Sequence, residues 1–272
     1  MKRLLVTLAL AMIAVSSNAA IQYEFMLKNT SDDDARGSAD MTGRATVDGF
    51  RSRVEFLSGS LYPPNTYVLS TDSTGRLYFV DPAKQWYTEI NTAGIATALG
   101  ASSIKIDNLK SNFETLEDKK KIAGHETSHH RVTLAYDITV TMKTIPVKQH
   151  VETEIESWTT DAFGDVPQNF LSRGMRTGNA DLDRLLDAES SKVSGFPLRQ
   201  LVTTRTFYDK PARTKINRPS TRTITRETCV TKIQQTEVSP TQFTIPVSYR
   251  RAEQGEAPKT QTQTLTFDPP TK

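Results

Sequence analysis

The sequence has 272 residues, of which 34 are Lys or Arg and 31 are Asp or Glu, so the formal net charge is +3. This near-neutral balance argues against a globally basic protein that binds nucleic acid. The chain is long enough to form one large domain with a substantial core.

Residues 1–19 have the three parts of a secretory signal peptide. Lys2 and Arg3 form a positive start, residues 4–15 are apolar except for one threonine, and small residues follow. The apolar run is about a dozen residues long, whereas a membrane-spanning helix needs about twenty. We therefore expect export to the periplasm and cleavage before Ala20, with Ile21 as the alternative first residue of the mature chain.

Removal of this segment takes away two basic residues and no acidic one, which leaves a net charge of +1. No cysteine lies near the cleavage position, so we expect no lipid anchor. No later segment is apolar enough to predict a membrane span. Cys229 is the only cysteine, and it therefore has no partner for a disulfide within the chain. We interpret it as a half-buried strand residue rather than a reactive thiol.

Most of the mature chain has the pattern of antiparallel strands. Residues 133–143 alternate apolar and polar side chains, and residues 147–157 repeat this alternation. A period of two with one apolar face predicts long neighbouring strands in a sheet that is covered on one side. Asp48 and Gly49 predict a tight hairpin turn. The other predicted strands are residues 21–27, 41–47, 50–56, 77–80, 85–90, 202–207 and 224–233.

Few helices are expected, and the segments that favour them are residues 91–99, 162–173 and 180–191, the last capped by Asn179. The predicted fold class is mainly β (α+β): an antiparallel, incomplete β-barrel or curved sheet with a few short covering helices. We assign residues 20–250 to this single domain. Residues 251–272 are polar and rich in Thr, Gln, Lys and Pro, and we expect a disordered tail.

The sequence lacks the Gly-x-Ser-x-Gly, phosphate-loop, His-Glu-x-x-His and Cys-x-x-Cys motifs. We therefore expect no enzyme activity, no cofactor and no metal. His125, His129 and His130 resemble metal ligands, but residues four apart on a strand are about 13 Å apart, too far for one zinc ion. We interpret them as surface histidines. A bend at Gly124 would bring them closer, so a metal-dependent enzyme that uses His125 and His129 is a third hypothesis.

Residues 199–226 carry eight basic side chains against Asp209 alone. The segment is either a solvated hairpin or a surface that contacts anionic lipid headgroups or an acidic partner. It has few aromatic residues, which argues against single-stranded nucleic acid as the partner. The residues assigned to this anionic-contact surface are Arg199, Arg205, Lys210, Arg213, Lys215, Arg218 and Arg222.

Several stretches together are similar to one family: residues 43–55, 77–89, 122–127, 155–161, 195–198 and 243–249. In this order the chain resembles the LolA-like superfamily of periplasmic proteins, and especially the uncharacterised exported bacterial proteins grouped with it. The resemblance implies an incomplete antiparallel barrel with helices across its mouth, in whose hollow better-known members carry lipoproteins or lipids. The chain departs from the family at Ser248, where glycine is common, and in a longer arginine-rich insertion between Tyr208 and Glu227.

The leading hypothesis is a soluble, non-enzymatic periplasmic protein that binds a lipid or another apolar ligand inside a half-barrel. The residues expected to line the cavity are Phe25, Leu27, Val54, Phe56, Phe79, Tyr136, Ile138 and Val140. The alternative is an envelope adaptor that binds a protein partner through its surface and has a filled core.

Overall fold

The computed structural model of the chain describes residues 20–32, 39–60, 62–71, 76–90, 101–142, 145–163, 184–185, 188–189, 191–208 and 220–253. Within these residues one 12-stranded sheet has the order β12-β6-β5-β4-β3-β2-β1-β11-β10-β9-β8-β7. The strands are β1 (Ala20–Ser31), β2 (Ala39–Asp48), β3 (Arg51–Gly59), β4 (Tyr67–Ser70), β5 (Leu77–Asp81), β6 (Trp86–Ile90), β7 (Ala101–Ile122), β8 (His125–Met142), β9 (Ile145–Thr160), β10 (Phe196–Tyr208), β11 (Thr221–Thr236) and β12 (Arg250–Arg251).

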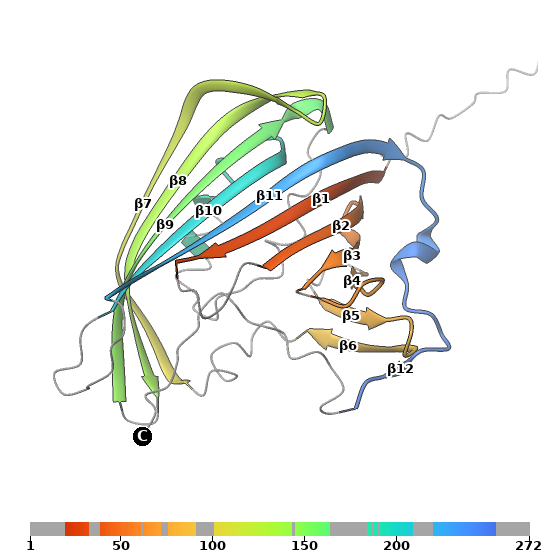
Figure 1. Cartoon of the computed structure of the whole chain (residues 1–272), viewed down its shortest axis with the longest axis horizontal. Helices are drawn as coiled ribbons and strands as arrows, with labels where there is room; N and C mark the ends of the chain where they lie inside the picture. The colour runs from red at the N-terminus through yellow and green to blue at the C-terminus, as the bar shows by residue number, and fades with distance from the viewer. Residues whose placement is uncertain are drawn as a thin grey trace, which may run out of the picture.

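Neighbouring strands are antiparallel except for β12 and β6, which run parallel. Figure 1 shows the sheet bent into an arch, with β7 to β10 on one side and β3 to β6 on the other. Register shifts in four of the strand pairs add local bends. Strands β7 and β12 end the sheet and do not pair with each other. The predicted fold class, a mainly β curved sheet or incomplete barrel, is therefore confirmed.

The predicted hairpin between β2 and β3 is present, but its turn lies one residue later than predicted. Asp48 still pairs with Arg51, so the two turn residues are Gly49 and Phe50. Gly49 has a φ of 58°, a value that glycine adopts without the steric cost of a side chain. The ladder thus extends through Asp48, which the dipeptide pattern assigns to the turn.

Three strands, β4, β7 and the two-residue β12, are not predicted from the sequence. Strand β7 has 22 residues, yet its pairing with β8 shifts register at three places. These irregularities and its many lysines hide the period of two. Strand β7 pairs on one side only, and charged side chains on such an edge disfavour pairing with other chains.

The main apolar core lies on the concave side of the arch. Its buried side chains come from β1 to β6, β10 and β11: Ile21, Tyr23, Phe25, Leu27, Met41, Ala45, Val47, Val54, Phe56, Val68, Phe79, Trp86, Phe196, Leu198 and Val230. The alternation of buried and less buried residues along β1 and β3 is the period of two expected for strands with one face toward a core.

The segment after β11 covers the outer face of β3 to β6. It contains the 3-10 helix η3 (Pro240–Phe243), and it ends in β12, which adds to the sheet edge beside β6 (Figure 1). Ile245 and Tyr249 from this segment pack against a second cluster formed by Tyr67, Leu69 and Val80. This part of the sheet is therefore apolar on both faces.

Helical structure in the described part of the chain is limited. The predicted helix 91–99 lies outside the described residues. Of 162–173, the first two residues belong to the 3-10 helix η2 (Asp161–Phe163) and 164–173 lie outside. Within 180–191, residues 184–185 and 188–189 are helical. No helix that is described is long and apolar enough to cross a membrane.

Two predictions on the chain ends are only partly covered. Residues 1–19, the predicted signal peptide, lie outside the described residues, as do 254–272 of the predicted tail. The tail prediction begins at Arg251, but Arg251 pairs with Tyr87 in β12, and the backbone N–H of Ala252 donates to Tyr87. The sheet therefore includes Arg251, which the prediction assigns to the tail.

Candidate ligand-binding face

All eight side chains predicted to line a cavity are buried. Five of them belong to the main core cluster: Phe25, Leu27, Val54, Phe56 and Phe79. The other three, Tyr136, Ile138 and Val140, form a separate cluster with Val151 of β9. Burial raises the pKa of the Tyr136 phenol to about 12, as expected in apolar surroundings.

The strand register places both clusters on one face of the sheet, because residues directly opposite each other in neighbouring strands share a face. The partners that link β1 to β8 are, in order, Asn29, Arg226, Val202, Ile155 and Val132. Asn29 shares its face with Leu27 and Phe25, and Val132 shares its face with Tyr136. The concave face is thus one continuous surface from β8 to β6.

This face encloses little empty space where β1, β3, β10 and β11 meet. Phe25, Val54, Leu198 and Val230 line a cavity there of about 20 Å³. That volume holds about one water molecule, whereas sites for small ligands measure several hundred Å³. A ligand of lipid size therefore requires the concave face to open. A shallower pocket of about 370 Å³ lies on the outer side, between Arg51, Tyr78 and η3.

A small group of polar side chains interrupts the apolar concave face. Arg226 of β11 lies opposite Asn29 of β1, and its Nε donates a hydrogen bond to Asn29 Oδ1 at 3.1 Å. Burial lowers the pKa of Arg226, and the nearby Tyr62 opposes this shift. Tyr62 itself stacks on Phe56, with ring centroids 4.2 Å apart.

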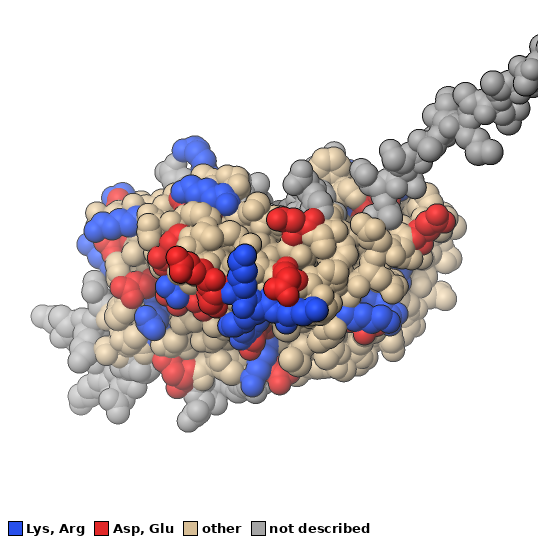
Figure 2. Space-filling view, turned by 90° about the horizontal axis from the view of Figure 1, so that it is seen from above, with Lys and Arg blue, Asp and Glu red and all other residues tan. Residues whose placement is uncertain are grey.

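The residues of the predicted anionic-contact surface do not all share a face. Arg199 and Arg205 lie on the outer face of β10, where Arg199 pairs with Glu227 at 2.8 Å. Arg222 lies on the concave face of β11, in register with Thr206. The other four, Lys210, Arg213, Lys215 and Arg218, lie outside the described residues. Figure 2 shows acidic and basic side chains intermingled on the upper surface of the arch.

The interpretation of the histidines as surface residues is wrong for two of them. His129 and His130 are 4% and 7% exposed, because the rings of Trp158 and Phe113 on the neighbouring strands cover them. The three rings also have separate surroundings: His125 contacts Phe163, His129 stacks on Trp158, and His130 stacks on Phe113. Among the residues described, no group of three or more His, Cys, Asp or Glu side chains is arranged to hold a metal ion.

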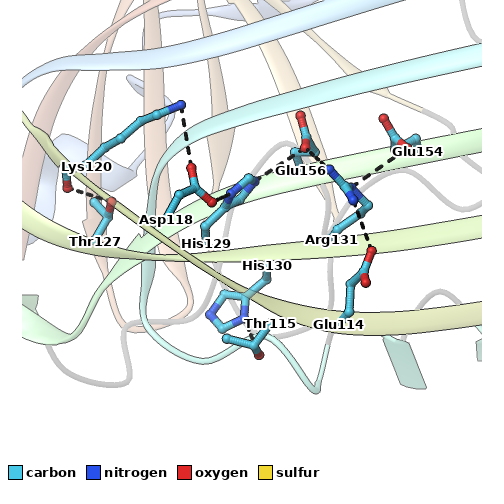
Figure 3. Close-up of polar contacts among 10 residues, drawn as sticks. All are labelled: Glu114, Thr115, Asp118, Lys120, Thr127, His129, His130, Arg131, Glu154 and Glu156. Carbon is cyan, nitrogen blue, oxygen red and sulfur yellow. Dashed lines mark hydrogen bonds and ion pairs between the residues drawn. The ribbon is translucent and has the colours of Figure 1, made fainter.

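His129 belongs to a network of charged side chains on the outer face (Figure 3). Its Nδ1 donates to Asp118 Oδ1 at 2.5 Å, and its Nε2 lies 3.5 Å from Glu156 Oε1. Glu156 also accepts a hydrogen bond from Arg131 at 2.9 Å, and Glu114 accepts another at 3.1 Å. The hydrogen bond from His129 lowers the pKa of Asp118, and the one to Glu156 raises the pKa of Arg131.

His130 lies on the opposite, concave face, because neighbouring residues of a strand point to opposite sides. Its Nδ1 is 3.2 Å from Thr115 Oγ1. Burial, and to a lesser degree the charge of His129, lower its pKa. Cys229 on β11 is half-buried as predicted, and burial raises the pKa of its thiol.

The sequence reasoning includes Arg226 only in a run of basic residues and does not single out Asn29 or Tyr62. A signal for Arg226 exists: it has the same parity as Ile224, Thr228 and Val230 in a strand-like stretch. Asn29 becomes relevant only through its pairing with Arg226, across 197 residues of sequence. No local pattern contains that relationship.

A scan against models of protein families finds no match for this chain. A search of curated proteins finds none either. Among solved structures, the chain is similar to an uncharacterised conserved protein from Thermus thermophilus, with a TM-score of 0.37, 8% sequence identity and coverage of 86% of this chain and 90% of that chain.

A second similar structure is the LolA superfamily protein NE2245 from Nitrosomonas europaea, with a TM-score of 0.33 and 9% identity. The likeness covers 84% of this chain and 90% of that chain. The resemblance predicted from the sequence is confirmed as a structural likeness alone. The function is therefore inferred from the residues of this chain.

Proposed function

We propose that this protein is a soluble, non-enzymatic periplasmic protein that binds a lipid or another apolar ligand against the concave face of its half-barrel. One observation carries the proposal. Among the apolar side chains of the described residues, Ile104, Ile106 and Leu109 of the adjacent strand β7 pack against the row of Tyr136, Ile138, Val140 and Val151. All of these side chains belong to the same sheet.

A row of large apolar side chains on a sheet requires an apolar cover, because each such side chain gains about 1.5 to 3 kcal/mol when it leaves water. On the other half of the arch the two sides of the concave face approach each other, since Val54 of β3 and Leu198 of β10 line the same small cavity. Each residue of the row on β8 and β9 is 8% exposed or less without a ligand, so an acyl chain would take the place of its present cover and keep an apolar group against Ile138.

The periplasmic part of the proposal is supported by residues 1–19, which have the three-part pattern of an export signal. A lipid carrier in that compartment needs a surface that shields acyl chains from water. The sheet is not closed between β7 and β12, so a ligand can approach the concave face without breaking a strand ladder.

The proposal is tested by purifying the protein from its native compartment and analysing organic extracts by mass spectrometry. The purified protein is also titrated with the uncharged apolar dye 1-N-phenylnaphthylamine. We expect a co-purifying lipid and saturable dye fluorescence. If no lipid co-purifies and the dye does not bind, the proposal is wrong.

A matched pair of variants locates the site. Ile138→Gln places an amide on the concave face, and Thr139→Gln places the same group on the outer face of the same strand. We expect a loss of dye affinity of about tenfold or more for Ile138→Gln and no change for Thr139→Gln. Circular dichroism melting of both variants shows whether each remains folded at the titration temperature.

The second candidate is an envelope adaptor with a filled core, and the cavity of about 20 Å³ favours it. This hypothesis expects dye binding to be absent and a partner to be captured by crosslinking in the native envelope. Neutralising Arg199 and Arg205 together is expected to change the set of crosslinked partners. An unchanged set contradicts the adaptor hypothesis.

A further inference from the structure

Arg226 contacts a neutral amide, whereas arginines on the outer face of the sheet contact carboxylates. Six described arginines of that face pair with a carboxylate, namely Arg44 with Glu24, Arg51 with Asp48, Arg53 with Glu55, Arg131 with Glu156, Arg199 with Glu227 and Arg251 with Glu89. Arg226 has no carboxylate within ion-pair distance among the described residues. Its contact there is the amide oxygen of Asn29.

The position of Arg226 makes this arrangement unfavourable in the absence of a ligand. It lies opposite Asn29, on the face that carries Leu27 and Phe25, and Asn29 is 7% exposed. A charge taken out of water without a counter-charge is costly. Burial lowers the pKa of Arg226, because it disfavours the charged form of the guanidinium.

The groups around Arg226 are suited to an anion. The guanidinium uses Nε to donate to Asn29, which leaves its two terminal amino groups free of described acceptors and able to hold a carboxylate or phosphate by two parallel hydrogen bonds. Because Asn29 Oδ1 accepts from Arg226, its amide NH₂ is available as a further donor.

Tyr62 supplies a hydroxyl group near Arg226. Its ring is half-buried and stacks on Phe56, with an angle of 12° between the ring planes. Burial raises the pKa of Tyr62, whereas the charge of Arg226 lowers it. The phenol therefore lies within the electrostatic reach of the guanidinium and remains a neutral hydrogen-bond donor.

Apolar surface begins directly beside these groups. Thr228 and Val230 follow Arg226 on the same face of β11, and both line the small apolar cavity together with Phe25. We propose that the concave face binds an anionic amphiphile whose carboxylate or phosphate head is held by Arg226, Asn29 and Tyr62 while its chain lies on the apolar part of the concave face. This inference rests on the proposed function and names the chemical class of its ligand.

The test compares three probes with the same chain length: dodecanoate, dodecyl phosphate and uncharged dodecanol. Each displaces 1-N-phenylnaphthylamine from the wild-type protein and from Arg226→Met. We expect the wild type to bind the two anions more tightly than the alcohol. We expect Arg226→Met to lose about tenfold or more in affinity for the anions and to bind dodecanol unchanged, because a hydrogen bond to a charged group is removed.

Arg44→Met is the matched control, since Arg44 lies on the outer face of β2, where it pairs with Glu24 at 3.1 Å; its affinities should equal those of the wild type. Acetate and inorganic phosphate, which have the head without the chain, should not displace the dye at the concentrations where the amphiphiles do. Displacement by inorganic phosphate alone would reassign the site to a free anion and overturn the inference.

Thermal unfolding of the ligand-free proteins separates a binding role from a structural one. Arg226→Met should be at least as stable as the wild type, because the substitution removes a half-buried charge and keeps an apolar chain that reaches about as far as Nε. A variant that is less stable and still binds dodecanoate like the wild type overturns the inference and leaves the proposed function intact. If none of the three amphiphiles nor the dye binds the wild type, the proposed function itself fails.

Discussion

The imidazole ring of His129 stacks on the indole ring of Trp158, with ring centroids 4.1 Å apart and 16° between the ring planes. The two residues lie opposite each other in β8 and β9. Lys120 Nζ lies 4.5 Å from the indole centroid and Arg199 Cζ lies 4.6 Å from it. Trp158 thus has an aromatic and two cationic neighbours, and it is the centre of a buried patch on the charged outer face.

This arrangement predicts that Trp158→Ala lowers the free energy of unfolding by about 3 to 5 kcal/mol, because a large buried side chain is removed together with its ring contacts. Trp158→Phe keeps part of the stacking and should lose less. Urea unfolding monitored by circular dichroism measures both. An alanine variant as stable as the wild type would show that the patch contributes nothing to folding.

The hydrogen bond from His129 to Asp118 predicts a pH-dependent contribution to stability. The folded-state pKa of Asp118 is lowered, so this contribution is fully present above the ordinary value of 3.8 and is lost as the pH falls through the lowered pKa. Asp118→Asn should therefore be less stable than the wild type at neutral pH, and the difference should vanish in acid. A difference that persists unchanged to the lowest pH contradicts this prediction.

His130 predicts a second pH dependence, in a higher range. Because burial lowers its pKa below the ordinary value of 6.5, the unfolded chain binds the proton first as the pH falls below 6.5. Stability should therefore decrease with falling pH in that window, by at most about 1.4 kcal/mol per pH unit from this group. His130→Phe, which preserves the contact with Phe113, should reduce the slope. Denaturant unfolding at a series of pH values measures it.

Gly43 is required by the close approach of a core ring. A Cβ atom at this position would lie 2.5 Å from Phe25 Cζ and 2.8 Å from the carbonyl oxygen of Glu55. Gly43→Ala should therefore cost about 1 to 3 kcal/mol of stability. The double variant with Phe25→Leu should lose less than the sum of the two single variants, because the smaller side chain relieves the clash. If the stability losses of the two single variants simply add up in the double variant, the side chain at position 43 does not contact the ring of Phe25.

The segment after β11 should stabilise the sheet through Phe243. Phe243 is 1% exposed, and the centroid of its ring lies 5.2 Å from Arg51 Cζ. Phe243→Ala should lower the free energy of unfolding by about 3 kcal/mol or more. Val247→Ala is the control within the same segment, and since Val247 is fully exposed, its effect should stay within about 0.5 kcal/mol. Equal effects of the two variants would show that the segment does not support the sheet.

Much of the strand content is readable from the sequence, because burial of one strand face imposes a period of two that needs no partner to be recognised. The alternation through Tyr136, Ile138 and Val140 correctly predicts their burial on a common face. Strand β7 escapes recognition because its edge position allows charges on both faces, and its register shifts interrupt the alternation.

The buried histidines show the limit of the same reasoning. His129 and His130 are adjacent, polar residues in a strand pattern, which favours exposure. Their burial comes from Trp158, Phe113 and the acidic side chains of the neighbouring strands, and none of these is near in sequence.

By itself, then, the sequence determines that this is a mainly β chain with one apolar face, since side-chain alternation is a local property. The tertiary structure alone decides which face each basic residue occupies. Pairing of β1 with β11 sets Arg226 against Asn29 inside the arch, while Arg199 pairs with Glu227 outside it. The physical reason is register: a shift of one residue reverses every side chain of a strand, and only the packing of distant strands selects between the two.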